Sequence, residues 1–136
     1  MTFIFLNQPE IIDANEVAKQ FCDIYYTGMS LHGLSQLLYL FDQNANCMHN
    51  GHKYNNIYNV LSSLSASHIE KIHYEKLIYS SSIIDKHLLL INVSGLCNGI
   101  TFWKQFTTVH AFSESFVLKI DENKRIFVHN YIFNLV

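Results

Sequence analysis

The side chains in this chain that are best suited to chemistry are its eight histidines and three cysteines. A metal centre needs several such ligands on one face, yet no H-x-H or H-x-x-x-H pair occurs. His68 and His73 are five positions apart in an extended stretch, so they point to opposite faces. His49 and His52 flank a turn, and two ligands alone do not make a site. The pattern predicts no metal and no cofactor, and each histidine is expected to be a structural or surface residue.

Acid–base catalysis is the other chemistry that these residue types could support. It needs a carboxylate or an imidazole of shifted pKa beside a donor that stabilises the developing charge. His129 and Glu114 are the candidates whose strand parity allows an inward direction, whereas Asn92 has only an amide, which cannot act as a base. No P-loop and no G-x-S-x-G motif is present. The sequence therefore favours a protein that is not an enzyme.

Charge and cysteine usage limit the possible partners and compartments. A net charge of −2 and a pI near 6.4 give no basic surface, so direct nucleic-acid binding is not expected. Cys22, Cys47 and Cys97 are widely spaced and form no C-x-x-C motif, which favours a reducing compartment. The apolar segment Phe3–Leu6 is too short to span a membrane, and we expect it to pack on the domain. One soluble domain over residues 1–136, cytosolic or nuclear, is the expectation.

Three helices are expected in the first half of the chain. Asp13, with Glu16 three residues later, is a capping-box pattern, and Gly28 is the expected C-terminal stop. The apolar stripe of this helix consists of Val17, Phe21, Ile24 and Tyr25. A second short helix is expected in "LHGLSQLLYLF", and a third in "NNIYNVLSSL" with Asn56 as its cap. A hairpin turn at Asn50-Gly51 lies between them.

The second half of the chain switches to period two and predicts four long strands. They are expected in "HIEKIHYEKLIYSSS", "KHLLLINVSGL", "FSESFVLKI" and "RIFVHNYIFNLV". In the last strand, strict alternation puts Arg125, Phe127, His129, Tyr131 and Phe133 on one face and Ile126, Val128, Asn130 and Ile132 on the other. The order of elements predicts an α+β fold, with three helices on one face of an antiparallel sheet.

The other face of the sheet then lacks a cover, because large apolar groups occupy both faces of the last strand. A second, related domain in a two-fold dimer would cover it, with Phe127, His129 and Tyr131 as contacts. The alternative is a monomer whose N-terminal segment folds across this face.

Five segments in order carry a family resemblance. "FCDIYYTGM", "CMHNG", "NNIYNVLSSL", "ESFVL" and "VHNYIF" resemble the landmarks of the nuclear transport factor 2 family over about residues 13 to 135. The resemblance implies a cone-shaped fold in which three N-terminal helices pack on a curved antiparallel sheet.

Three groups within that family are distinguished by their residues. The import carrier of the small GTPase Ran has a Trp-Glu pair and an acidic loop, where this chain has "HNG" and "CNGITFWKQFTTV" without a carboxylate, so Ran binding is not expected. "YYTGM" resembles the small subunit of the heterodimeric mRNA exporter. "CMHNG" and "VHNYIF" are similar to the dimeric domain of Rasputin-type stress-granule scaffolds.

The resemblance implies recognition of Phe-Gly peptides, such as those of nucleoporins. Carried over by position, the peptide slot lies between the first helix and the last strand and is lined by Val17, Phe21, Leu40 and Phe133. A Phe ring needs such an apolar slot, and the following Gly allows close backbone approach. The alternative is that these four residues belong to the core.

The connection "NGITFWKQFTTVHAF" carries the only Trp of the chain. We expect Phe102, Trp103 and Phe106 to contact a dimer mate or partner, because aromatic residues dominate interface energetics. Alternatively, the segment extends the two strands and packs on itself.

Three functions follow as hypotheses. The first is a non-enzymatic, dimerising adaptor that docks Phe-Gly nucleoporins and helps to carry protein or mRNA–protein cargo, in the cytoplasm, in the nucleus and at the nuclear pore. The second is a scaffold domain that captures Phe-Gly motifs in ribonucleoprotein granules. The third is a small-molecule enzyme, because the same fold resembles ketosteroid isomerase and scytalone dehydratase, which hold acid–base residues inside the cone.

Overall fold

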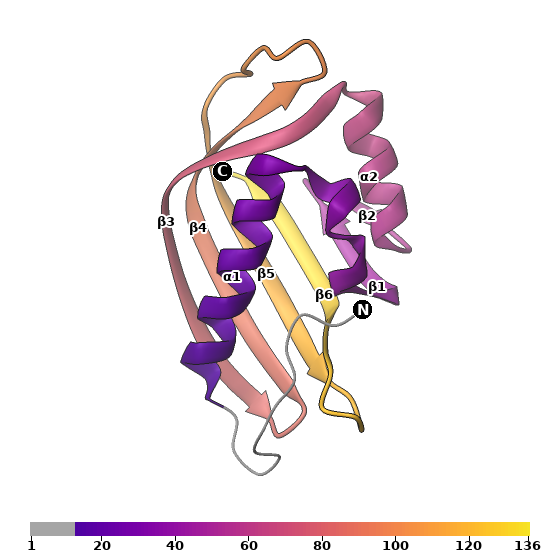
Figure 1. The fold of residues 1–136 in the computed structure, drawn as a ribbon, viewed down its shortest axis with the longest axis vertical. Coiled ribbons are helices and arrows are strands. Elements are labelled where there is room, and N and C mark those ends of the chain that lie inside the picture. The colour runs from indigo at the N-terminus through magenta and orange to yellow at the C-terminus, as the bar shows by residue number, and fades with distance from the viewer. Residues whose placement is uncertain (1–12) are drawn as a thin grey trace.

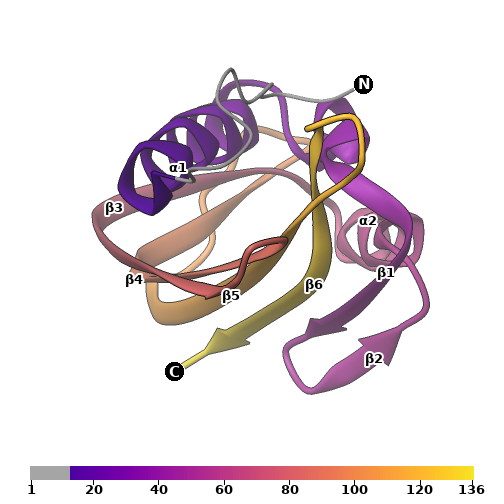
Figure 2. The ribbon, with the colours of Figure 1, turned by 90° about the horizontal axis from the view of Figure 1, so that it is seen from below.

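The computed structural model describes residues 13–136, so the segment Phe3–Leu6 lies outside the described residues. Its elements are α1 (Ala14–Leu31), η1 (Leu34–Gln36), η2 (Leu38–Leu40), β1 (Phe41–His49), β2 (His52–Tyr54), α2 (Ile57–Ala66), β3 (Ile69–Asp85), β4 (Leu88–Thr101), β5 (His110–Ile120) and β6 (Ile126–Leu135). The helix α1 lies across one face of the sheet (Figure 1), and the sheet curves around that side (Figure 2). The predicted α+β, cone-shaped fold is confirmed.

The six strands form one open sheet in the order β2-β1-β6-β5-β4-β3. The strands β3 to β6 make the predicted antiparallel meander of four long strands, and β3 is the longest of them at 17 residues. The pair β1–β6 is parallel, so the prediction of a wholly antiparallel sheet is wrong at this one pair. The cause is topological: the meander brings β6 back beside β1 in the same direction.

The first helix begins where predicted and ends later than predicted. The Asp13 carboxylate accepts a hydrogen bond from the Glu16 backbone N–H at 3.2 Å, which satisfies an otherwise unpaired donor of the first turn. The helix runs past Gly28 to Leu31, and the glycine at positive φ after it is Gly33, with φ 86°. No helix among residues 13–136 is long and apolar enough to cross a membrane.

The predicted second helix is instead a pair of 3₁₀ turns, η1 and η2. Its buried residues are Leu34, Leu37 and Leu40, at intervals of three. A 3₁₀ helix has three residues per turn, so this spacing puts all three side chains on one side. The apolar run that suggested an α-helix therefore folds as the tighter form.

The turn and cap predictions between these elements are confirmed. Asn50 and Gly51 both have positive φ, 52° and 85°, and join β1 to β2 with His49 paired to His52. The Asn56 side chain accepts a hydrogen bond from the Asn59 backbone N–H at 3.1 Å and caps α2.

The strict alternation predicted for β6 is wrong, because a β-bulge interrupts it at His129. Val117 of β5 pairs with Asn130 and the next residue, Leu118, pairs with Val128, so β6 has one extra residue. A bulge of this kind moves all later side chains to the opposite face. Ile126 and Val128 are therefore buried on the same face as Tyr131.

Candidate functional site

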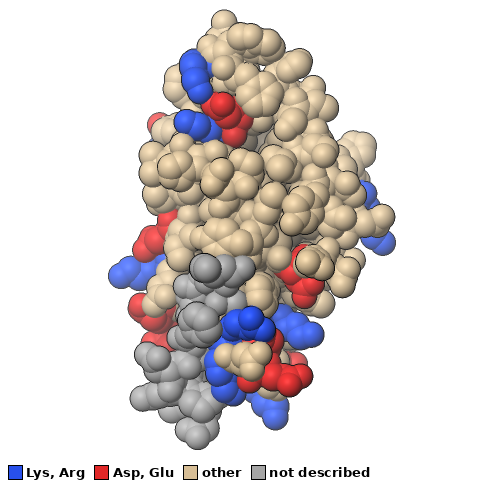
Figure 3. All heavy atoms as spheres, turned by 45° about the vertical axis from the view of Figure 1, so that its right-hand side comes forward, with Lys and Arg blue, Asp and Glu red and all other residues tan. Residues whose placement is uncertain are grey.

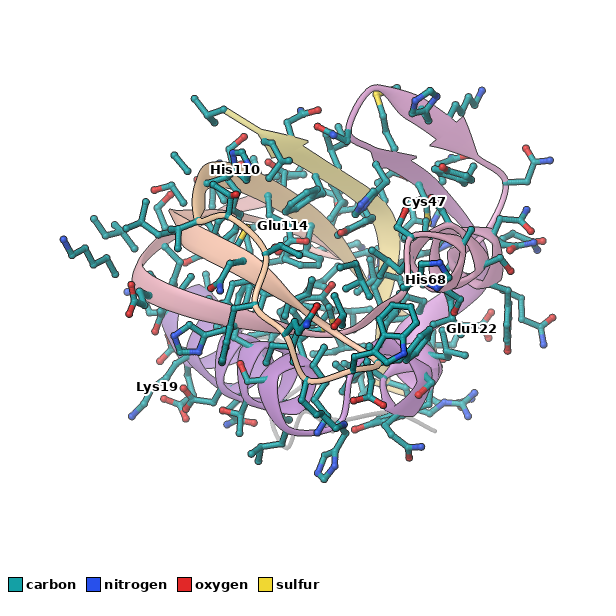
Figure 4. All side chains as sticks on the ribbon, turned by 90° about the horizontal axis from the view of Figure 1, so that it is seen from above. Lys19, Cys47, His68, His110, Glu114 and Glu122 are labelled. Atoms are coloured by element: carbon teal, nitrogen blue, oxygen red, sulfur yellow. The ribbon has the colours of Figure 1, made fainter. Side chains whose placement is uncertain are left out.

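A cavity of about 160 Å³ lies between the helices and the concave face of the sheet. The helices α1 and α2, the turn η1 and the strands β1, β3, β4, β5 and β6 all contribute residues to its lining, and Thr107 and Thr108 of the β4–β5 connection add to its wall. The view from this end shows that connection passing across the cone (Figure 4). Most of the lining is apolar and aromatic, so the few polar groups inside decide what the cavity can do.

Glu114 is the charged residue at the centre of this cavity. It lies on β5 between the buried Phe112 and Phe116, and only 2% of it is exposed. Figure 4 shows it among the side chains inside the cone, whereas Lys19 of α1 points away. The Tyr26 hydroxyl donates a hydrogen bond to the Glu114 carboxylate at 2.6 Å. The predicted inward direction of Glu114 is confirmed.

Two opposing effects set the acidity of Glu114. Burial disfavours the charged form and raises the pKa of the carboxyl to about 7, whereas hydrogen bonds from Tyr26 and Tyr131 lower it and only partly offset burial. Near neutral pH this group therefore exists in both protonation states. It can accept or donate a proton, or act as counter-ion, toward whatever enters the cavity.

Sequence reasoning missed Tyr26 and Tyr131 as partners of Glu114. Both are buried, and burial raises the pKa of each phenol well above its ordinary value. Tyr26 also meets the Tyr74 ring edge-on, with centroids 4.7 Å apart. A buried Tyr needs a partner for its hydroxyl, so the pair "YY" in α1 was the available signal for a polar group inside.

His49 forms part of the cavity wall rather than a metal site. Its ring stacks on Phe133, with centroids 4.7 Å apart. Burial, with a smaller effect from His52, lowers the pKa of His49 to about 4, so the imidazole is neutral at neutral pH. His129, the other predicted acid–base candidate, lies at the bulge and does not line this cavity.

The four residues predicted to bind Phe-Gly peptides differ in accessibility. Phe21 and Leu40 are completely buried and Val17 is 4% exposed, all three within the hydrophobic core. Phe133 is half-buried and lines the cavity. A peptide could therefore meet Phe133 directly, but it could reach the other three only if the packing around them opened. Their role in peptide binding stays a prediction.

The β4–β5 connection is an ordered tip that exposes three aromatic side chains. Phe102, Trp103 and Phe106 are 45%, 65% and 67% exposed. The backbone N–H of Thr101 donates to Gln105, and that of Phe102 donates to His68. The Lys104 ammonium pairs with Glu70 at 2.5 Å and ties the tip to β3. We call residues 102–109 the aromatic tip.

The outer face of the sheet, on the side away from α1, is mixed rather than uniformly apolar. Its polar members on β4, β5 and β6 are Asn92, Ser94, Ser113, Ser115, Lys119, Asn130 and Asn134. Phe127, half-buried, lies beneath the Arg125 guanidinium at 5.9 Å, and Ile132 is 44% exposed. Tyr131, which we predicted on the same face as Phe127, is 3% exposed and points inward because of the bulge.

Much of one face of the molecule carries no charged side chains. In the space-filling view, uncharged side chains cover the middle, and Lys, Arg, Asp and Glu gather toward the ends and edges (Figure 3). Among residues 13–136 no group of three or more His, Cys, Asp or Glu side chains could hold a metal ion. Cys22, Cys47 and Cys97 are buried free thiols, and burial raises the pKa of each, to about 12 for Cys22.

Three solved structures illustrate what the fold is similar to. Nuclear transport factor 2 (Ntf2) from Cryptosporidium parvum has a TM-score of 0.68 at 16% identity, covering 93% of this chain and 100% of that chain. The yeast Ubp3-associated protein Bre5 has a TM-score of 0.65 at 18% identity, covering 90% and 95%. The Mtr2–Mex67 M domain complex of C. albicans has a TM-score of 0.71 at 9% identity, covering 90% of this chain and 94% of that chain. At such identities the likeness shows the fold alone.

Enzymes share this fold as well. The dehydrochlorinase LinA-type3 from Novosphingobium barchaimii has a TM-score of 0.67 at 10% identity, covering 89% of this chain and 86% of that chain. No curated protein matches the chain in sequence. A family model described as the nuclear transport factor 2 (NTF2) domain, in contrast, matches residues 17–135. The chain therefore belongs to the nuclear transport factor 2 domain family.

Proposed function

We propose that this chain is a non-enzymatic, dimerising adaptor of nucleocytoplasmic transport. In this role it binds Phe-Gly motifs of nucleoporins and helps to carry protein or mRNA–protein cargo between cytoplasm and nucleus. Membership of the nuclear transport factor 2 domain family and the fold shared with Ntf2 and with the Mtr2–Mex67 complex support this proposal.

The aromatic tip is the observation that carries the adaptor proposal. Phe102, Trp103 and Phe106 expose large apolar surface on a turn whose backbone is already ordered by hydrogen bonds. An ordered tip loses little conformational entropy on binding, and Trp and Phe supply the apolar area that interfaces use. A second domain that covers the tip and the neighbouring apolar side chains of the sheet would remove this surface from water.

The outer face of the sheet supports a contact of moderate strength. Phe127 and Ile132 offer apolar area, but polar side chains lie beside both: Lys119 and Arg125 next to Phe127, and Ser115 next to Ile132. Interfaces of transient partners have this mixed composition, whereas permanent dimers are more apolar. The proposed dimer is therefore one that exchanges partners, as an adaptor must.

Phe-Gly recognition rests on the peptide slot implied by the family resemblance. Phe133 is the member of that slot with access to open space, and its ring also stacks on Phe112 at 5.8 Å. In this proposal, the Phe ring of a peptide packs beside Phe133, and ring entry loosens the contacts of Val17, Phe21 and Leu40. The aromatic tip carries Lys104 and no carboxylate, so Ran·GDP is not expected to bind.

A titration with a Phe-Gly repeat peptide tests the proposal. We expect saturable binding by the native chain, and loss of binding in Phe133→Ala. The matched control is Tyr58→Ala, which removes a ring that is 54% exposed on α2 and does not line the cavity bordered by Phe133, and it should bind normally. Absence of peptide binding by the native chain, or unchanged binding in Phe133→Ala, would overturn the Phe-Gly part of the proposal.

A further inference from the structure

Glu114 is a buried acid without a cationic partner in the part of the chain that the structure describes. The ion pairs among residues 13–136 are made by His73, Lys104 and Arg125, each with a different acid. Glu114 contacts phenol groups instead. A carboxylate removed from water needs either a proton or a nearby positive charge. No side chain supplies that charge here, so a ligand could.

The hydrogen bonds around Glu114 favour a ligand that donates. Tyr26 donates to one carboxylate oxygen at 2.6 Å, and Tyr131 also hydrogen-bonds to this group. Donors aimed at a carboxyl group stabilise its ionised form. The Glu114 carboxylate can therefore accept a further hydrogen bond, and a ligand that carries donors would supply it. The other polar residues of the lining, besides His49 and the tyrosines, are Asn98, Thr107, Thr108 and His110.

His49 provides a second unused polar atom in the cavity wall. Its Nδ1 is buried and has no hydrogen-bond partner among the described residues. The ring is neutral at neutral pH, because burial lowers the pKa of His49 to about 4. In the tautomer protonated on Nε2, the Nδ1 atom is an acceptor. Glu114 and the His49 ring thus both line the cavity, and the Nδ1 atom itself lies below the accessible surface of the wall.

The size and walls of the cavity limit the rest of the ligand. Its volume of about 160 Å³ is close to that of an engineered cavity, about 150 Å³, that binds benzene. Rings of Tyr25, Tyr74, Tyr131 and Phe133 border it. Aromatic faces attract cations, and the attraction grows when water is excluded.

We propose that the cone cavity binds a small organic cation, a primary ammonium group on an apolar body of about benzene size, with its N–H groups on Glu114. An anion would meet the Glu114 carboxylate and be repelled. A neutral alcohol would gain the apolar contacts and lose the charge pairing. This site does not depend on the adaptor role, and it shares only Phe133 with the proposed peptide slot.

Three probes of similar size that differ in charge test the proposal on the native chain: benzylamine, benzyl alcohol and benzoate. Binding is measured by saturation-transfer NMR and isothermal titration at about pH 8, above the pKa of about 7 of Glu114. We expect benzylamine to bind roughly tenfold or more tightly than benzyl alcohol, as expected when a desolvated charge pair is formed. Benzoate should not bind.

Glu114→Gln removes the charge and keeps the shape of the side chain. This variant should lose most of the preference for benzylamine while benzyl alcohol binds as before. Glu122→Gln, which removes an exposed acid between β5 and β6, is the matched control and should keep the native order of affinities. Equal binding of benzylamine and benzyl alcohol by the native chain, absence of benzylamine binding, or an unchanged preference in Glu114→Gln would overturn the proposal. The native series needs no variant and remains decisive if Glu114→Gln does not fold.

Discussion

The two faces of the sheet formed by β4, β5 and β6 differ in the side chains that they carry. One register row places Val93, Glu114 and Phe133 on the inner face, and the next row places Asn92, Ser115 and Ile132 on the outer face. The inner row encloses one acid among apolar groups. In the outer row the Ser115 hydroxyl donates to the Asn92 side-chain oxygen at 2.7 Å.

The inner face therefore contributes mainly to folding stability, whereas the outer face remains available for contact with partners. The inner face removes aromatic rings from water and so supplies much of the folding free energy. The outer face satisfies its polar groups locally or with water, so the domain can expose it without a strong tendency to aggregate. The aromatic tip brings three exposed aromatic side chains together in one short segment, where they can serve partner binding at little cost to the fold.

Removal of one aromatic ring from each face should give the largest difference in the free energy of unfolding. Phe21→Ala deletes a completely buried ring that packs edge-on against Phe116, with centroids 4.8 Å apart, and should lower the free energy of unfolding by about 3–5 kcal/mol. Phe127→Ala, on the outer face, should cost about 1 kcal/mol or less. Urea denaturation of both variants measures the difference, and similar losses would contradict the assignment of the two faces.

The buried acid and His49 should give opposite pH dependences. The pKa of Glu114 is about 7 in the native state, against an ordinary value of 4.5, so the unfolded chain ionises first and stability falls as pH rises between these values, by about 3 kcal/mol. His49 has a lowered pKa, so its contribution to stability is lost as pH falls from 6.5 toward 4. Between about pH 4.5 and 6.5 the two effects oppose each other.

Substitution of one group at a time separates these effects. In Glu114→Gln the stability should rise with pH over this window, because His49 alone remains. In His49→Phe, which keeps a ring against Phe133, the stability should fall with pH. Urea unfolding at several pH values measures both profiles. Profiles that match the native one in both variants would show that neither group is buried as described.

Change at the aromatic tip should hardly affect the fold. Trp103→Ala removes a side chain that is 65% exposed and should change the free energy of unfolding by about 0.5 kcal/mol or less, while weakening self-association. Equilibrium unfolding at a concentration low enough to keep the chain monomeric measures the first effect. A loss comparable to that of Phe21→Ala would mean that the tip belongs to the core.

The smallest expected effect is on the polar part of the outer face. Ser115→Ala removes the hydroxyl that bonds to Asn92, in a region open to water, and should change stability by about 0.5 kcal/mol or less. Thermal unfolding beside the native chain tests it. A loss of several kcal/mol would mean that the outer face depends on a polar network.

Local signals were enough to predict most of the framework from the sequence. The Asp13 cap, the Asn50-Gly51 turn, the Asn56 cap and the four long strands each depend on a few neighbouring residues. The features that were missed depend on distant contacts. The bulge at His129 is defined by the pairing of β6 with its neighbouring strands, and the Tyr26–Glu114 hydrogen bond joins residues 88 positions apart.

The inward direction of Glu114 followed from strand parity alone. The pairing of β5 with β6 is regular from Phe112 through Glu114, which pairs with Phe133, and its register shifts only after Val117. The environment of Glu114 could not be predicted, because that depends on which rings α1 and β3 bring to it. The spacing of Leu34, Leu37 and Leu40 could have indicated the 3₁₀ turns, because three-residue intervals fit that helix better than the α-helix.

The emission of Trp103 tests the dimerising-adaptor account most directly, because it is the only tryptophan and reports the aromatic tip alone. A dilution series should record its emission wavelength together with the molar mass from light scattering. The account predicts a mass approaching twice 15.8 kDa at high concentration, with emission moving to shorter wavelength as the tip is covered. A mass of 15.8 kDa and constant long-wavelength emission at every concentration, alone and with a related domain added, would contradict it.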